Sequence, residues 1–106
     1  MKTPIEHILK NLFESTYPAL DSLSIRIECP FDSGIGVECE GKSLSGVVYP
    51  EPDMDALSNY VDELHAAHPD DRFNIVTIVM TSPTDIVIER TFDADFQREV
   101  ESMVQD

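Results

Sequence analysis

Residues 23–40 read LSIRIECPFDSGIGVECE, and two segments of this stretch alternate between apolar and polar side chains. The apolar positions are 23, 25, 27 and 29 in the first segment and 35, 37 and 39 in the second. A period of two is typical of half-buried β-strands. Residues 31–34, Phe-Asp-Ser-Gly, have the chemistry of a turn. Because so short a connection joins them, we expect the two strands to pair antiparallel.

Three more strands are predicted around this pair. Gly41-Lys42 is expected to turn the chain into a strand at residues 44–49, which Pro50 and Pro52 end. Residues 73–80 are almost continuously apolar, which favours a central strand covered on both faces. Residues 82–85 are a predicted turn, and residues 86–92 are the last predicted strand.

Capping signals and apolar periodicity predict three helices. Residues 3–6 form a capping box with Pro4 at the first helical position, and apolar residues then recur with helical spacing until Tyr17-Pro18. Asp53 is the expected N-cap of a second helix over residues 54 to about 67, and Asp93 that of a third helix.

The element order is therefore α-β-β-β-α-β-β-α, in one domain over residues 1–106. It predicts an α+β fold in which helices pack on one face of a largely antiparallel sheet. If all three helices cover the same face, the opposite face is acidic, solvated and available to a partner. The charged residues expected there are Arg26, Glu28, Glu38, Glu40 and Glu89.

Acidic side chains greatly outnumber basic ones, with 21 Asp and Glu against 7 Lys and Arg and a formal charge of -14. Such a charge disfavours binding to nucleic acid or to an anionic membrane and favours cationic proteins. A surface that only improves solubility is the competing explanation. The hydrophobic content of 42% is ordinary for a chain with a folded core. With no signal peptide and no apolar stretch of membrane-spanning length, we expect a cytoplasmic protein.

The two cysteines, Cys29 and Cys39, are too few for a disulfide framework. Both fall on the predicted inward faces of neighbouring strands, where buried free thiols are expected. A reversible disulfide between them is the alternative, if they pair across the hairpin.

No enzymatic motif emerges, and we predict neither catalytic residues nor a cofactor. A G-x-S-x-G nucleophile motif is absent. His65 and His68 share a helix face, which leaves a metal-dependent hydrolase as an alternative, but the Glu of a two-histidine zinc helix is missing. Histidines at a helix C-terminus also interact favourably with the helix dipole, so we predict no metal site.

Residues 73–93 resemble part of the YezG-like family of small immunity proteins, which are antitoxins of bacterial polymorphic toxins. The resemblance rests on Phe73-Asn74 at the start of a strand, on Phe92-Asp93 at the end of the next, and on the preceding helix. Immunity proteins of contact-dependent growth inhibition systems are also small and acidic. The resemblance implies a protein that binds and blocks the toxin of its own system.

Charge and resemblance together predict an immunity protein that occludes a basic toxin domain such as a nuclease. The expected partner-binding residues are Glu28, Glu38 and Glu40 on the sheet, Tyr49 as an anchor, and Glu51, Asp53 and Asp55 before and in the second helix. Phe31 is a further candidate anchor, although Tyr49 and Phe31 could both be core residues. A small adaptor or secretion chaperone is the main alternative, and the chain is expected to be a monomer or a homodimer.

Overall fold

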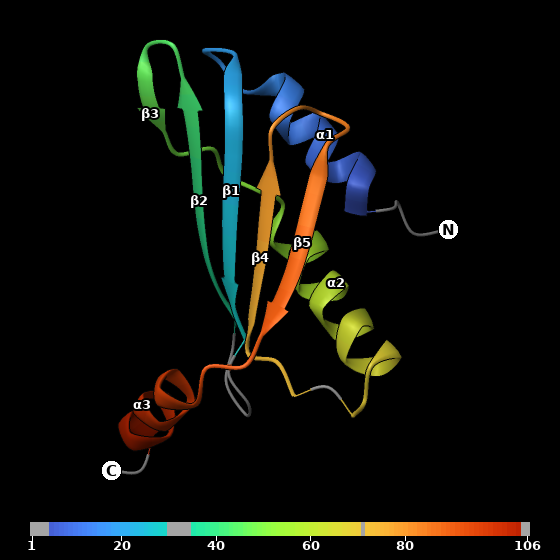
Figure 1. Ribbon diagram of the computed structural model, residues 1–106, viewed down its shortest axis with the longest axis vertical. Coiled ribbons are helices and arrows are strands. Elements are labelled where there is room, and N and C mark those ends of the chain that lie inside the picture. Colours follow the sequence, from blue (N-terminus) through green and yellow to red (C-terminus); the bar gives the residue numbers. More distant parts are fainter. Residues whose placement is uncertain (1–4, 30–34, 71, 105–106) are drawn as a thin grey trace.

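The computed structural model describes residues 5–29, 35–70 and 72–104. Within these ranges it contains helices and strands in the predicted order, which confirms the α+β fold class (Figure 1). The elements are α1 (Ile5–Ser15), β1 (Leu20–Glu28), β2 (Gly36–Ser43), β3 (Gly46–Val48), α2 (Met54–Ala67), β4 (Ile75–Met80), β5 (Ile86–Thr91) and α3 (Ala94–Val104).

The five strands form one antiparallel sheet in the order β3-β2-β1-β4-β5. β1 lies at its centre, and Ile25 of β1 is opposite both Cys39 of β2 and Ile78 of β4. Because opposite residues of an antiparallel pair point to the same face, this register collects the apolar positions on one side. α2 connects β3 at one edge to β4 and crosses behind the sheet.

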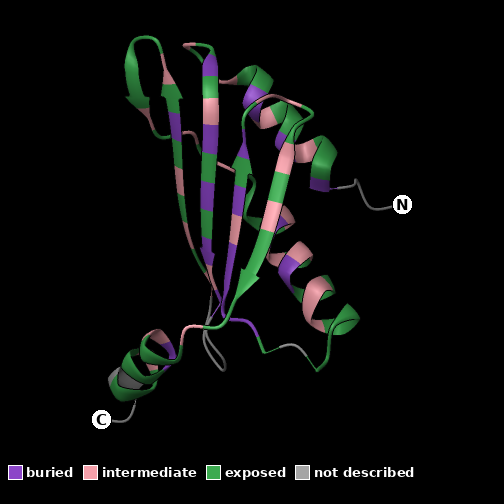
Figure 2. Ribbon diagram, in the orientation of Figure 1, coloured by how far each residue is buried: buried purple, intermediate pink, exposed green. Residues whose placement is uncertain are grey.

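α1 and α2 lie on one face of the sheet, behind the strands in Figure 1. The core forms between them, and side chains such as Leu9, Leu57, Ile25 and Ile78 are at most 1% exposed. Burial of each such side chain contributes about 1.5–3 kcal/mol. Figure 2 shows the resulting alternation of buried and exposed residues along β1. The face that points toward the viewer is left uncovered by α1 and α2.

α3 differs from the expectation for the third helix because it lies beyond one end of the sheet rather than on its face (Figure 1). Only Phe92 and Asp93 separate it from β5. Asn74 holds the backbone of Asp93 by two hydrogen bonds, and Asp93 Oδ1 accepts from Phe96 N at 3.0 Å. The predicted N-cap is thereby confirmed, and the helix starts where the sheet ends.

The predicted turn at Gly41-Lys42 is wrong, because both residues belong to β2. The chain turns instead at Leu44-Ser45. Gly46, which follows this turn, has φ of 126°, a value that L residues rarely adopt. A Cβ on Gly41 would lie 2.6 Å from Leu20 Cδ2, so this glycine permits close packing of the strands.

The expectation that residues 73–80 are covered on both faces holds at Ile75, which is 4% exposed, but is wrong farther along β4. β4 has a strand on each side, but Val79 on its uncovered face is 40% exposed. Apolar residues on both sides of this strand therefore do not imply two covering layers.

Cys29 and Cys39 do not pair across the hairpin. Cys39 is opposite Ile25, four residues from Cys29, and four strand residues span about 13 Å. A disulfide requires Cα atoms within roughly 7 Å. Both thiols are free.

Candidate functional site on the open face of the sheet

The register shows which side chains share the uncovered face, called here the open face. Glu38, Arg26, Thr77 and Glu89 lie in one row across β2, β1, β4 and β5. The next row contains Glu40, Ser24, Val79 and Val87. Glu28 belongs to the same face because it follows Arg26 by two residues on β1. The predicted set of charged residues, Arg26, Glu28, Glu38, Glu40 and Glu89, is thus brought together on one surface.

A hollow of about 470 Å³ lies over the β2 side of this face. It is lined by Ser24, Arg26, Glu38, Cys39, Glu40 and Tyr49. Tyr49 follows β3 directly, and it is 75% exposed. It is therefore a surface residue, and the alternative that it belongs to the core is excluded. Three of the predicted partner-binding residues, Glu38, Glu40 and Tyr49, meet in this hollow.

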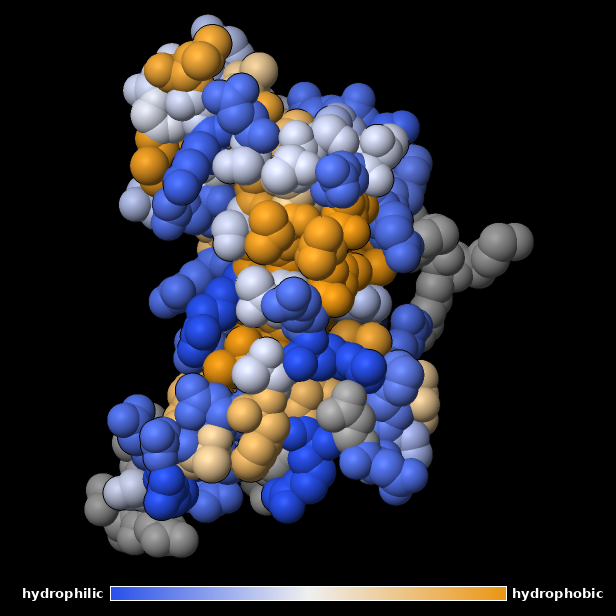
Figure 3. Space-filling model, in the orientation of Figure 1, coloured by the Kyte–Doolittle hydropathy of each residue, from blue (hydrophilic) through white to orange (hydrophobic). Residues whose placement is uncertain are grey.

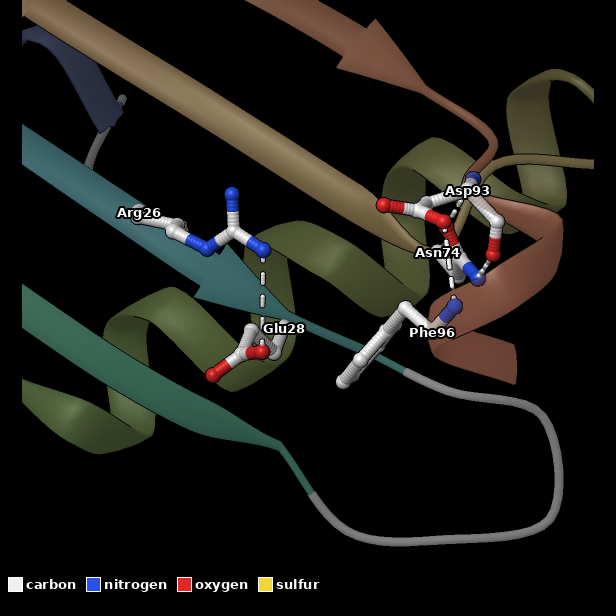
Figure 4. Close-up of polar contacts among 5 residues, drawn as sticks. All are labelled: Arg26, Glu28, Asn74, Asp93 and Phe96. Carbon is white, nitrogen blue, oxygen red and sulfur yellow. Dashed lines mark hydrogen bonds and ion pairs between the residues drawn. The ribbon is translucent and has the colours of Figure 1, made fainter. Parts of the chain in front are cut away.

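The charges in the hollow are not equivalent. Arg26 forms an ion pair with Glu28 on the same strand, with Nη2 and Oε2 3.7 Å apart (Figure 4). Glu38 and Glu40 form no ion pair or hydrogen bond with the described part of the chain. Their carboxylates are exposed and can be used by a partner, whereas that of Glu28 is already engaged.

Apolar side chains lie beside these charges. Val79 and Val87 are opposite each other on β4 and β5 and are 40% and 52% exposed. Figure 3 shows an apolar area over this part of the open face, surrounded by polar atoms. An apolar area with a polar rim is the general arrangement of a protein-binding surface.

Asp53 and Asp55 lie elsewhere, around a second hollow of about 330 Å³ between α1 and α2. Ile5, Ile8, Ala56, Asn59, Tyr60 and Glu63 complete its lining. Asp53 caps α2, since its Oδ1 accepts from Ala56 N at 3.1 Å, which confirms the predicted cap. Burial, with a smaller contribution from Glu6, raises the pKa of Tyr60. The predicted acidic set is therefore divided between two sides of the molecule.

Glu51 is exposed on the segment between β3 and α2 and lines neither hollow. Phe31 lies outside the described residues. We place the candidate site at the open-face hollow because no described residue engages its two exposed carboxylates, while one carboxylate of the second hollow caps a helix.

His65 has a packing role. Its ring stacks on Phe73 with centroids 4.2 Å apart, and its buried Nε2 atom has no hydrogen-bond partner among the described residues. His68 is the C-cap residue of α2. Among the described residues, no three His, Cys, Asp or Glu side chains are grouped in a way that could hold a metal ion.

Sequence reasoning did not predict that Ser24 lines the open-face hollow. It also did not predict the exposed apolar area that Val79 and Val87 form beside the hollow. The alternation in β1 assigns Ser24 to the open face, but only the strand order places β4 and β5 beside it.

In the part of the chain that the structure describes, no helix has the length and apolar character of a membrane span. Comparisons of the chain with protein-family models, curated proteins and solved structures find no match.

Proposed function

We propose that this chain is a binding protein that uses the open face of its sheet to hold a cationic protein. The observation that carries the proposal is the hollow in which Glu38 and Glu40, whose carboxylates no described residue engages, lie beside the exposed ring of Tyr49. The narrower form of the proposal is an immunity protein that covers the active site of a basic toxin domain. The resemblance of residues 73–93 to YezG-like immunity proteins supports this narrower form.

The residues of the hollow suit two stages of association. A formal charge of -14 attracts a cationic partner over long range and raises the association rate at low salt. Once in contact, Glu38 and Glu40 accept hydrogen bonds from Lys or Arg side chains. Tyr49 contributes apolar contact area, a hydroxyl group and a ring face on which a cation can rest.

Neutralisation follows from competition for the same basic groups. The Lys and Arg side chains with which a nuclease binds phosphate are also suitable partners for carboxylates. A protein that binds these Lys and Arg side chains covers the active site. It also occupies the positive charges that would otherwise bind the substrate. The chain itself needs no reactive group for this mechanism.

The proposal is tested first at the gene locus and then in solution. We expect a neighbouring gene for a secreted protein with a basic C-terminal domain, and we expect this chain to protect cells that express that domain. Substitution of Glu38→Lys together with Glu40→Lys should slow association about tenfold or more at low salt.

A matched control is Asp62→Lys with Glu99→Lys, which changes the net charge equally at exposed helical positions. The control should retain most of the association rate. Equal effects of the two double variants, or protection by the Glu38/Glu40 double variant as strong as that by the wild type, would overturn the proposal.

A further inference from the structure

β2 has a partner strand along only part of its outer edge. β3 pairs with it through residues 41–43, where Gly41 is opposite Val48 and Ser43 is opposite Gly46. Within the described chain, residues 36–40 have no strand on that side. Figure 1 shows β3 leaving the sheet at the upper end of β2 and the rest of the β2 edge open. Among the described residues, nothing pairs with the edge beside the candidate hollow.

The backbone groups that point to this free edge belong to Val37 and Cys39. Cys29 N donates to Asn74 O at 2.8 Å, so the odd-numbered residues of β1 direct their backbone groups toward β4. The even-numbered residues of β1 then bond to the even-numbered residues of β2, which they face in the register. The N–H and C=O groups of residues 37 and 39 consequently point away from β1.

The side chains along this edge divide by face. Glu38 and Glu40 are exposed on the open face, and Val37 and Cys39 are partly buried against the core on the other face. A strand added here would place alternate side chains beside the two carboxylates and the remaining ones beside Val37 and Cys39. Charge and polarity complementarity thus specify a strand in which basic and apolar residues alternate.

The opposite edge of the sheet is less suitable for such a strand. β5 also lacks an outer partner within the described chain, but its side chains include both Glu89 and Arg90. Arg90 would repel a basic strand, and its guanidinium lies over the Phe73 ring at 5.9 Å. The free part of β2 carries carboxylates without a basic residue among residues 36–40.

We infer that the cationic partner adds a strand to the free edge of β2, with Lys or Arg side chains over Glu38 and Glu40 and apolar side chains beside Val37 and Cys39. Strand addition gives affinity through backbone hydrogen bonds and specificity through alternate side chains. This inference rests on the proposed function and specifies how the partner is held. Tyr49, which follows β3, lies beside this edge and would contact the added strand.

The test uses a short synthetic peptide in which Lys and Val alternate, together with the ¹⁵N-labelled full chain. We expect binding that slows hydrogen exchange at the Val37 and Cys39 amides. N-methylation of the peptide nitrogens that face β2 should weaken binding about tenfold or more, since each methyl group removes a backbone hydrogen bond to the β2 edge. A peptide of equal composition with its Lys residues grouped together should also bind more weakly.

Three results would overturn strand addition. These are equal affinity of the methylated and unmethylated peptides, unchanged exchange at Val37 and Cys39, or no binding of the alternating peptide at all. The proposed function is judged separately by association of the chain with the basic domain encoded beside it. The Glu38→Lys/Glu40→Lys variant could lose that association while peptide methylation has no effect. This combination would support the proposed function and reject strand addition.

Discussion

Asn74 and Asp93 exchange two hydrogen bonds of 2.8 Å, although 19 positions separate them in the sequence. Asn74 Nδ2 donates to the carbonyl oxygen of Asp93, and Asp93 N donates to Asn74 Oδ1 (Figure 4). The backbone of Asn74 also accepts from Cys29 N and donates to Thr91 O. One fully buried residue therefore connects the ends of three strands through its backbone and the start of α3 through its side chain.

Substitution of Asn74→Ala should lower the free energy of unfolding by about 2–4 kcal/mol, because two partly buried backbone groups of Asp93 lose their partners. Asn74→Asp should also destabilise the protein, since a carboxylate cannot donate to the Asp93 carbonyl. Urea denaturation measures both effects. A loss below about 0.5 kcal/mol for Asn74→Ala would show that the two bonds are dispensable.

Gly41→Ala should destabilise the protein by about 1–3 kcal/mol through overpacking. The added Cβ would lie 2.6 Å from Leu20 Cδ2 and 3.2 Å from Val48 Cγ2. The double variant with Leu20→Ala should lose less stability than the sum of the single variants, because truncation of Leu20 removes the nearest clash. Strictly additive losses in chemical denaturation would contradict this assignment of the clash.

Much of the fold follows from local sequence signals. The alternation in β1 and β2, the helical stripes and the caps at Asp53 and Asp93 were all predictable, because each depends on residues close together in the chain. The position of α3 was not, because it depends on the long-range contact between Asn74 and Asp93. Gly41 was mistaken for a turn residue because its tight packing against Leu20 depends on strand pairing.

The candidate site was predictable only in part. The alternation in β2 puts Glu38 and Glu40 on the open face, and Tyr49 joins them because β3 pairs beside β2. Asp53 and Asp55 are close to Tyr49 in sequence but lie on the helical side. The segment that carries Glu51 passes from the sheet edge to the start of α2. This change of layer separates Asp53 and Asp55 from Tyr49.

His65→Phe should raise the free energy of unfolding by about 1 kcal/mol. The substitution keeps an aromatic ring against Phe73 and removes the buried Nε2 atom that has no hydrogen-bond partner. His68→Phe is the control, because the His68 side chain is exposed and its replacement should have little effect. Thermal unfolding of both variants gives the comparison. A lower midpoint for His65→Phe than for the wild type would show that the Nε2 atom makes a stabilising interaction and would contradict the prediction.

Burial raises the pKa of the Cys29 and Cys39 thiols from 9.0 to about 11. Below pH 9 both thiols are protonated in the folded and unfolded states, so they do not alter stability with pH. Between pH 9 and 11 the unfolded chain loses these protons first, and the thiols should therefore make stability fall as pH rises. Alkylation by iodoacetamide, measured on Cys39→Ala and Cys29→Ala variants, reports each thiol separately. A midpoint near pH 9 in the folded protein would contradict the effect of burial.

The most direct test of binding by the open face is a ¹⁵N NMR titration of the chain with the basic domain encoded beside its gene. We predict that the largest amide shift changes occur at Ser24, Arg26, Glu38, Glu40 and Tyr49, and that they diminish when salt is raised from about 0.05 M to about 0.5 M. Shift changes centred on Asp53, Asp55 and Tyr60, or spread evenly over all the acidic residues, would contradict the account.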